Sequence, residues 1–286
     1  MRPEDWHFID GLDAFLARAG SFLRSRPDLH TVPLTVTEQL RMRGTQAYGD
    51  EAPFFGVLER NGEVRGAYFC TPPYRVSVTP ITPEDAGSLA AHLAGIGRPV
   101  SGVIGERTAV ATLVRAWERG TGAVATLHER QRLYRLGTLT APAAMPTGRP
   151  RVAAEPDRDR LVCWYGEFME AIGGVGTRAD GWADARIAYG GITFWEAADG
   201  TPVSMAGVTP MVAGQIRVGP VYTPSHLRGR GYAGAVTAEV SRAALAAGAD
   251  QVLLFTDLAN PTSNSIYQRI GYRPIEDSVV LEFVAP

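Results

Sequence analysis

The sequence has little of what several protein classes depend on. Among its 286 residues only Cys70 and Cys163 are cysteines, which excludes the dense disulfide framework of small secreted domains. Both lie in apolar stretches and are expected to be buried free thiols, with a single disulfide as the alternative. The five histidines have no paired spacing and no C-x-x-C motif occurs, so no metal site is predicted.

Long apolar runs and an excess of one charge are missing as well. No run of about 18 apolar residues is present, which argues against a membrane-spanning helix. The N-terminal residues MRPEDWHFID include acids where a secretion signal would have an apolar stretch. The formal net charge is -2, so neither nucleic acid nor an anionic membrane is expected as a partner. These properties predict a cytoplasmic protein. A monomer and a homodimer are both left open.

A proline-rich segment divides the chain into two similar halves. Residues 141–157 hold four prolines and almost no large apolar side chains, which predicts a linker between a domain at 1–140 and a domain at 158–286. Each half is expected to begin with a helix and a hairpin, followed by strand, helix, strand, helix and strand. The hairpin turns are Asn61-Gly62 and Asp199-Gly200. The repeated order suggests the hypothesis of an ancient duplication.

The predicted elements follow from apolar periodicity and turn residues. In the first half, helices are expected at 10–24, 83–94 and 106–118, and strands at 53–60, 64–71, 74–79, 100–105 and 131–139. In the second half, helices are expected at 158–172, from the glycine-rich turn to about 247, and at 261–270, and strands at 191–197, 202–209, 215–222, 251–256 and 278–284.

The strongest local signal is the glycine-rich stretch 222–234, YTPSHLRGRGYAG. A predicted strand runs into it and a predicted helix leaves it. Glycines at a helix start let backbone N–H groups approach an anion, and the helix dipole adds about half a positive charge there. Arg228 and Arg230 supply further positive charge. The stretch therefore predicts a diphosphate-binding cradle, with a glycine turn carrying two solvated arginines as the plainer alternative.

Residues 229–234 also match the dinucleotide-binding pattern G-x-G-x-x-G, and Asp257 ends the next strand. Two features count against a nicotinamide-dependent enzyme. Residues 224–227 separate the strand from the glycines, and only 52 residues follow Gly234, too few for the rest of a doubly wound sheet.

The downstream residues fit another family better. Residues 255–273, FTDLANPTSNSIYQRIGYR, together with Arg228-x-x-Gly231-x-Ala233, resemble the GNAT superfamily of N-acetyltransferases. The resemblance implies tandem α/β domains, each a mixed, mostly antiparallel sheet flanked by helices. Over 1–140 it is only architectural, because no R-x-x-G-x-G/A follows the strand at 74–79. That first copy is therefore expected to be degenerate and the second to be catalytic.

The same resemblance implies an activity. Acetyl-CoA would be the co-substrate, without a metal, and an amine of a small molecule or peptide would attack its acetyl group directly. Tyr267 would protonate the departing CoA thiolate. Strand 216–222 would separate from its parallel neighbour to admit the thioester, and Gly219-Pro220 suits a bulge there. The implied cofactor-binding residues are Val221, Tyr222, Thr223, Arg228, Gly229, Arg230, Gly231, Tyr232, Ala233, Gly234, Asn260, Ser263 and Asn264.

The acceptor side is less defined by the sequence. A base is needed for the amine, and Glu196, at the end of a strand, is the candidate, although a solvated acid is the plainer interpretation. Other acids are Glu167 on the helix at 158–172, and Asp180 and Asp184 on an expected loop. Trp164, Trp182 and Trp195 would either line an acceptor pocket or pack in the core. The alternative function is a non-catalytic acyl-CoA-binding or regulatory module.

Overall fold

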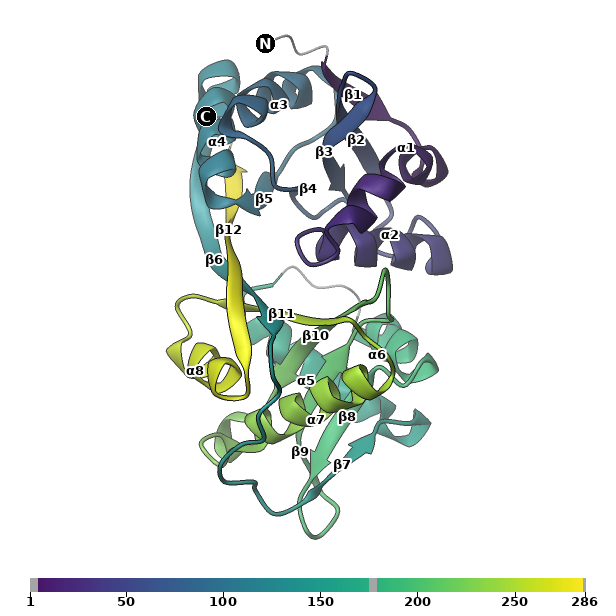
Figure 1. Cartoon of the computed structure of the whole chain (residues 1–286), viewed down its shortest axis with the longest axis vertical. Helices are drawn as coiled ribbons and strands as arrows, with labels where there is room; N and C mark the ends of the chain where they lie inside the picture. Colours follow the sequence, from purple (N-terminus) through teal and green to yellow (C-terminus); the bar gives the residue numbers. More distant parts are fainter. Residues whose placement is uncertain (1–4, 175–178, 285–286) are drawn as a thin grey trace. The chain divides into compact units, whose positions relative to one another are not determined.

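The computed structural model describes residues 5–174 and 179–284. The chain forms two compact units (Figure 1). Unit 1 extends to Arg132 and also takes in the chain from Glu276, whereas unit 2 comprises Leu133–Ile275. Both units are mixed α/β structures in which helices pack on a sheet, as expected.

Unit 1 contains most of the first half of the chain. Its elements are β1 (Trp6–Ile9), α1 (Leu12–Ser25), α2 (Thr31–Arg43), β2 (Phe54–Arg60), β3 (Glu63–Cys70), β4 (Val76–Val78), α3 (Pro83–Gly95), β5 (Gly102–Glu106), α4 (Arg107–Thr121) and β6 (Val124–Leu136), which continues into unit 2. The strands are ordered β1-β2-β3-β4-β5-β12. The pair β4–β5 is parallel, and the other pairs along this order are antiparallel.

Unit 2 repeats this order of elements. They are β7 (Arg149–Val152), α5 (Arg158–Ala171), α6 (Ala179–Ala188), β8 (Ile192–Glu196), β9 (Pro202–Val208), β10 (Gln215–Tyr222), α7 (Tyr232–Ala246), β11 (Gln251–Asp257), α8 (Pro261–Arg269) and β12 (Tyr272–Val284), which continues into unit 1. The strands are ordered β6-β11-β10-β9-β8-β7, and β10–β11 is the parallel pair. The full repeat supports the hypothesis of duplication.

The last strand of each half is used by the other half. In unit 1, Ser278–Glu282 of β12 pair with Gly102–Glu106 of β5. In unit 2, the end of β6 lies beside β11. Because β6 and β12 are shared in this way, the compact units do not have the bounds predicted from the proline-rich segment. That segment also contains a strand, since β7 pairs with β8 along Arg149–Val152.

Unit 1 buries apolar side chains on both faces of its sheet. Neighbouring residues of β2 point to opposite faces, because side chains alternate along a strand. Phe54 packs in the cluster formed with α3 and α4, while the ring of Phe55 stacks on Phe15 of α1 with centroids 4.8 Å apart. Both helix layers are thereby attached to the sheet.

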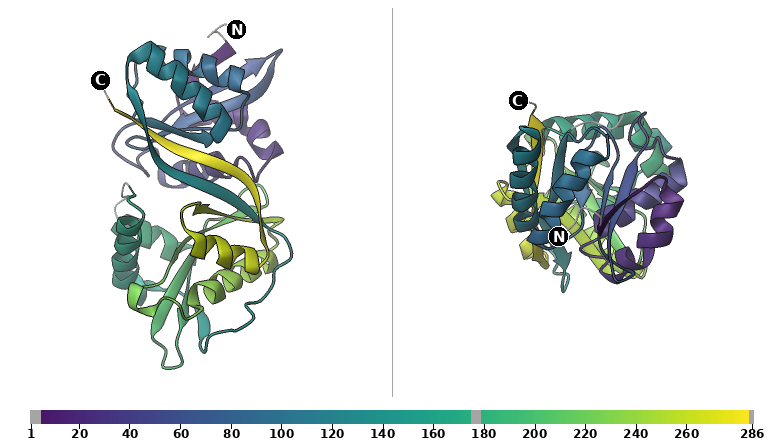
Figure 2. Two further views of the ribbon diagram at one scale, coloured as in Figure 1. Left: turned by 90° about the vertical axis from the view of Figure 1, so that its left-hand side faces the viewer. Right: turned by 90° about the horizontal axis from the view of Figure 1, so that it is seen from above.

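Unit 2 also has helices on two faces. Figure 2 shows α5 and α6 on one side of its strands and α7 and α8 on the other. Trp164 of α5 packs with Phe194 and Tyr222 in the cluster on the first face. On the second face Val236 of α7 and Tyr267 of α8 pack in a separate cluster. The sheet therefore separates two chemically distinct sides.

Two strands and two helices were not predicted: β1, β7, α2 and α6. For α2 the sequence TVPLTVT carries a proline and β-branched residues, which disfavour a helix interior. The structure places Pro33 in the first turn, where its missing N–H is tolerated. The hydroxyls of Thr35 and Thr37 donate back to the carbonyls of Thr31 and Pro33. Packing thus overrides weak local propensity.

Candidate functional site

The strands β10 and β11 separate toward their C-terminal ends. Residues Gln215–Val218 of β10 pair in parallel with Gln251–Leu254 of β11. Within the described residues the ladder goes no further, although β10 continues to Tyr222 and β11 to Asp257. The edge of β10 that faces β11 is thus free of ladder bonds from Gly219 onward. The ends of β10 and β11 beyond the ladder are therefore not joined to each other.

The predicted bulge is confirmed on the other edge of β10. The pairing with β9 shifts register between Val218 and Val221. An extra residue in one strand changes which face the following side chains point to. Val218 and Val221 both lie toward α7 and α8, whereas Tyr222 lies toward α5. The bulge therefore directs the Tyr222 ring to the face opposite the glycine-rich turn.

The glycine-rich turn opens α7 without a side-chain cap. Gly231 is the N-cap residue with φ 83° and ψ -4°, and no side chain accepts a hydrogen bond from the first turn. Gly229 also has a left-handed φ of 78°, a conformation that glycine adopts without strain. The backbone N–H groups that begin a helix have no intrahelical partner. Their positive end is available to an anion.

Two arginines stand beside this helix start. Arg228 donates from Nε to the carbonyl of Thr223 at 3.1 Å, and Arg230 donates to the carbonyl of His226 at 3.4 Å. Both side chains are exposed. Among the residues that the structure describes, neither arginine pairs with a carboxylate. Their charges add to that of the helix start.

The matching place in unit 1 is built differently. The helix α3, which follows the parallel strand β4, is capped by Thr82, whose hydroxyl oxygen accepts from the Asp85 N–H at 3.1 Å. Its first turn carries Glu84 and Asp85. Acidic groups at a helix start already occupy the positive end and would repel an anion. This helix start is therefore unsuited to a diphosphate.

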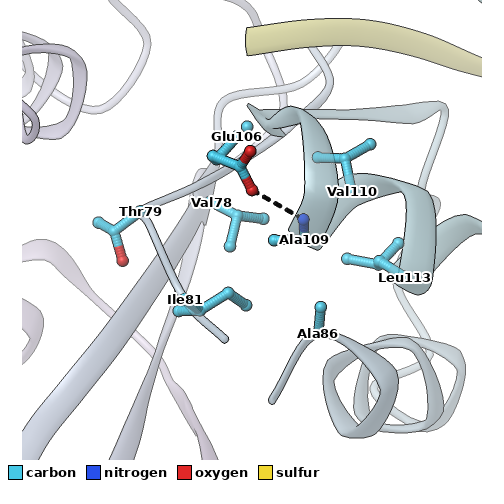
Figure 3. A pocket seen from close by; sticks show the side chains of 9 residues that line it. Val78, Thr79, Ile81, Ala86, Glu106, Ala109, Val110 and Leu113 are labelled. Carbon is cyan, nitrogen blue, oxygen red and sulfur yellow. Dashed lines mark hydrogen bonds between the residues drawn. The ribbon is translucent and has the colours of Figure 1, made fainter. Parts of the chain in front are cut away.

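A small pocket lies between α3 and α4 where β4 and β5 end. Apolar side chains fill most of its lining (Figure 3). The Glu106 carboxylate accepts from the Ala109 N–H at 2.9 Å and caps α4. The pocket is lined by Val78, Thr79, Ile81, Ala86, Gly105, Glu106, Ala109, Val110 and Leu113. Unit 1 thus has a small, mainly apolar pocket where its own parallel strand pair ends.

The polar residues that open α8 are largely occupied by local bonds. Asn260 is the N-cap, as predicted, and its side-chain oxygen accepts from the Ser263 N–H at 3.0 Å. Asn264 donates to the carbonyls of Asp257 and Asn260, and its oxygen accepts from the Tyr134 hydroxyl at 2.8 Å. Asn264 therefore fixes the start of α8 with every polar atom of its side chain.

Tyr267 lies on the buried face of α8. Its ring stands 6.2 Å from that of Tyr272 in an edge-on arrangement. Burial raises the pKa of its hydroxyl to about 12, and a hydrogen bond with Ser263 acts in the opposite direction. The phenol consequently stays protonated at any physiological pH and can serve as a hydrogen-bond donor.

Glu196 is buried and held by two arginines. Arg151 donates to Oε1 at 2.5 Å, and Arg149 donates to Oε2 at 3.4 Å. Both ion pairs lower the pKa of the Glu196 carboxyl, and the pair with Arg151 has the larger effect. A carboxylate with a lowered pKa is a weak base. The geometry favours a role for Glu196 in joining β7 to β8.

No sequence pattern connects Tyr222, Glu167 and Ser204, which the fold brings together around the end of β10. The Tyr222 hydroxyl donates to Glu167 Oε2 at 2.6 Å. The Ser204 hydroxyl donates to the Tyr222 carbonyl at 3.0 Å and lies 2.8 Å from the Thr223 hydroxyl. The only sequence signal for Ser204 was a polar residue inside the apolar strand PVSMAGV. Glu167 and Ser204 lie 55 and 18 residues before Tyr222 in the sequence, and no motif links them to it.

Two expectations about other residues are corrected. Cys163 is exposed on α5, so only Cys70 is a buried thiol, and both cysteines are free. Asp180 and Asp184 lie on the helix α6 rather than on a loop. Asp184 accepts from Arg158 at 2.5 Å.

The three tryptophans do not gather around one pocket. Trp164 packs on the α5 face of the sheet and Trp195 on the α7 face. Trp182 stacks on Tyr165 with ring centroids 4.0 Å apart. Core packing therefore accounts for Trp164 and Trp195.

Two general features of the described residues bear on function. No helix in residues 5–174 and 179–284 combines the length and apolarity needed to cross a bilayer. The same part of the chain has no group of three His, Cys, Asp or Glu side chains arranged to hold a metal ion.

Comparison with known proteins relates this architecture to solved structures. Residues 207–281 match the model of the family described as FR47-like protein. No curated protein matches the sequence. A GCN5-related N-acetyltransferase from Sphaerobacter thermophilus is 17% identical with a TM-score of 0.64, and the match covers 100% of this chain and 98% of that one.

Two further structures match over nearly their whole length. An acetyltransferase of the GNAT family from Colwellia psychrerythraea is 12% identical with a TM-score of 0.61, covering 97% of this chain and 98% of the other. A tandem GNAT protein from the clavulanic acid biosynthesis pathway is 13% identical with a TM-score of 0.59, covering 98% of each chain. The shared fold includes the tandem arrangement.

Proposed function

We propose that the chain is an acetyl-CoA-dependent N-acetyltransferase of the GNAT superfamily, because residues 207–281 match the FR47-like family model and its fold is that of solved GNAT proteins. The acetyl group would pass to a primary amine of a small molecule or peptide. The observation that supports this most directly is the uncapped glycine start of α7, which is connected to the separated strand β10 by residues 223–231. Unit 2 would carry the activity and unit 1 would be its degenerate copy.

The residues of unit 2 fit the chemical groups of acetyl-CoA. The first N–H groups of α7, in Tyr232, Ala233 and Gly234, would bind the diphosphate together with Arg228 and Arg230. A side chain added at Gly229 would meet no atom within 4 Å, so the turn has open space for phosphate oxygens. The bound substrate supplies an acetyl thioester, and the separated ends of β10 and β11, beside Val221 and Thr223, would receive its pantetheine arm.

Tyr267 would donate a hydrogen bond to the sulfur that leaves. A thiol has a pKa of about 8.5, whereas that of the Tyr267 hydroxyl is about 12. Complete proton transfer from Tyr267 to the thiolate is therefore uphill. Tyr267 would stabilise the thiolate chiefly as a donor. Ser263, its hydrogen-bond partner, would set the direction of that donor.

The remaining predicted residues have supporting roles. Asn260 and Asn264 would shape the start of α8 beside the pantetheine arm. The base role of Glu196 stays a prediction, and its ion pairs with Arg149 and Arg151 count against it. Monomeric and homodimeric forms both stay compatible with this proposal.

The test is binding and turnover of acetyl-CoA by the full chain. We expect calorimetry to detect acetyl-CoA binding, and Arg228→Ala to weaken it about tenfold, because a charge-assisted hydrogen bond to phosphate is lost. Arg98→Ala, at an exposed arginine of unit 1, is the matched control. Thiol release is then measured over a panel of amines. The sequence contains no lysine, so no side chain of the protein offers a primary amine of its own.

Each outcome separates the candidate functions. Acetyl-CoA binding with amine-dependent thiol release supports the enzyme. Binding without release for any amine supports the non-catalytic acyl-CoA-binding module. Binding of a nicotinamide dinucleotide without acetyl-CoA binding would refute the proposal and favour the G-x-G-x-x-G interpretation.

A further inference from the structure

We propose that Tyr134 is a positioning residue for acetyl-CoA binding. Its hydroxyl orients the side chain of Asn264, and Asn264 in turn holds the separated end of β11 against the start of α8. The assignment rests on the proposed function, because it takes the separated ends of β10 and β11 as the place of the pantetheine arm. It gives β6, a strand from the first half of the chain, a direct part in the site of unit 2.

The Tyr134 hydroxyl passes a hydrogen bond in one direction. Tyr134 lies near the end of β6, within unit 2, and its side chain is fully buried. The Gln268 side-chain amide donates from Nε2 to the hydroxyl at 3.0 Å, and the hydroxyl donates to Asn264 Oδ1 at 2.8 Å. A phenol has a single proton to donate. Since Gln268 already donates to the phenol oxygen, that proton is directed to Asn264.

The Asn264 carboxamide is thereby held in one orientation. Its oxygen accepts from Tyr134, and its amino group donates to the carbonyls of Asp257 at 2.8 Å and Asn260 at 2.7 Å. The reversed amide would place its oxygen against both carbonyl oxygens and would turn its amino group toward the Tyr134 proton. Without the hydroxyl, the amide loses the donor to Oδ1 and can turn more freely, because this terminal torsion has broad energy minima.

The bond to the Asp257 carbonyl lies where β11 has separated from β10. The parallel ladder of these strands ends with Val218 and Leu254, and Asp257 is the last residue of β11. The Asn264 amino group therefore ties this end of β11 to α8. A strand end that is held in place before acetyl-CoA arrives has less freedom to lose on binding, and this raises the affinity.

The residues after β6 hold the other end of α8. The Gly137 N–H donates to the Gly271 carbonyl at 3.0 Å, and the Thr140 N–H donates to the Ile270 carbonyl at 3.0 Å. Tyr267 lies between these bonds and the start of the helix. One continuous segment from the first half of the chain therefore contacts α8 on both sides of the residue proposed to act on the leaving sulfur.

The experiment measures acetyl-CoA binding to Tyr134→Phe in the full chain by calorimetry. We expect the Kd to rise about fivefold, because a buried hydrogen bond that orients the site is lost. Tyr272→Phe is the matched control, since it removes a buried hydroxyl, 2.7 Å from that of Ser241, in the same core cluster. Its Kd should stay within about twofold of the wild type, because that bond lies outside the chain of bonds to β11. The variants are compared at a temperature at which circular dichroism shows them to be folded.

A double-mutant cycle tests whether Tyr134 acts through Asn264. Asn264→Ala alone is expected to raise the Kd about fivefold or more. Adding Tyr134→Phe should then change the Kd by less than about twofold, because the amide that the hydroxyl orients is already gone.

Hydrogen exchange in the free protein gives a second measurement. Both single variants should speed the exchange of the backbone amides in residues 255–260, because the end of β11 is held less firmly. An asparagine that only contacts bound acetyl-CoA would leave the exchange of the free protein unchanged.

The outcomes distinguish this assignment from the proposed function. Failure of the wild type to bind acetyl-CoA would refute the proposed function, and this assignment with it. Normal binding by the wild type with equal Kd values for Tyr134→Phe and Tyr272→Phe would overturn only the role of Tyr134, and so would additive effects in the cycle. If Tyr134→Phe does not fold, exchange in free Asn264→Ala decides. Faster exchange in residues 255–260 supports the assignment, and unchanged exchange overturns it.

Discussion

Replacing Tyr267 by phenylalanine tests the centre of the proposed mechanism. The change removes one hydroxyl and keeps the ring that packs against Tyr272. A hydrogen bond to a charged group contributes about 1.5–3 kcal/mol. If the hydroxyl stabilises the leaving thiolate as a donor, kcat should fall about 10–100-fold. The Kd for acetyl-CoA should change by less than about threefold, because the thiolate is formed only during the reaction.

Tyr272→Phe is the matched control for this substitution. Tyr272 is also buried in the core of unit 2, and its hydroxyl is 2.7 Å from that of Ser241. Each variant loses one buried hydroxyl contact and should lose about 1 kcal/mol of stability. Only Tyr267→Phe should lower kcat. Amine-dependent thiol release gives kcat, and thermal unfolding gives stability. Equal kcat values for the two variants would refute the role of Tyr267.

Three further predictions concern stability and cofactor binding. Burial, followed by repulsion from Glu106, raises the pKa of Glu276 to about 7, so ionising it opposes folding. The folded state therefore keeps its full stability below about pH 4.5 and loses part of it as pH rises through 7. Glu276→Gln should gain about 2 kcal/mol of stability at pH 8 and nothing at pH 4, measured by urea unfolding. Glu196→Gln should lose about 1–2 kcal/mol of stability, because it breaks the ion pair with Arg151. Its kcat should stay within about threefold of the wild type. A hundredfold loss of kcat in a folded variant would instead support Glu196 as the base. Gly231→Ala should lower the stability by about 1 kcal/mol, because Gly231 has a left-handed φ. It should also weaken acetyl-CoA binding in calorimetry. Unchanged affinity would contradict the assignment of the glycine-rich turn as the diphosphate-binding cradle.

Local sequence patterns predicted the elements that flank the site but not their partners. The hairpins at Asn61-Gly62 and Asp199-Gly200 were found because their turn residues have few alternatives. The bulge at Gly219-Pro220 was expected because both residues weaken a strand ladder. The shared use of β6 and β12 was not expected, because no local sequence pattern shows which sheet each of these strands joins.

The same distinction applies to the site. Asn260 was identified as an N-cap because an asparagine before Pro261 has a local bonding partner three residues on. Glu196 was proposed as a base because the sequence shows a carboxylate at a strand end but does not show Arg151 beside it. The Tyr222–Glu167 bond depends on how the bulge rotates β10. Such contacts require the fold, since no residue type alone implies them.

The two copies of the fold show where a binding site is gained or lost. Both have a parallel strand pair followed by a helix, and both strand pairs are short. In unit 1 the helix start is closed by Thr82 and carries Asp85, which also pairs with Arg60 at 2.5 Å. In unit 2 the corresponding start has glycine and no cap. A capped helix start stabilises the fold by about 1 kcal/mol, so unit 2 forgoes that stability where unit 1 keeps it. An uncapped start persists most readily where a ligand supplies the missing partner, and this favours unit 2 as the unit that binds the anionic substrate.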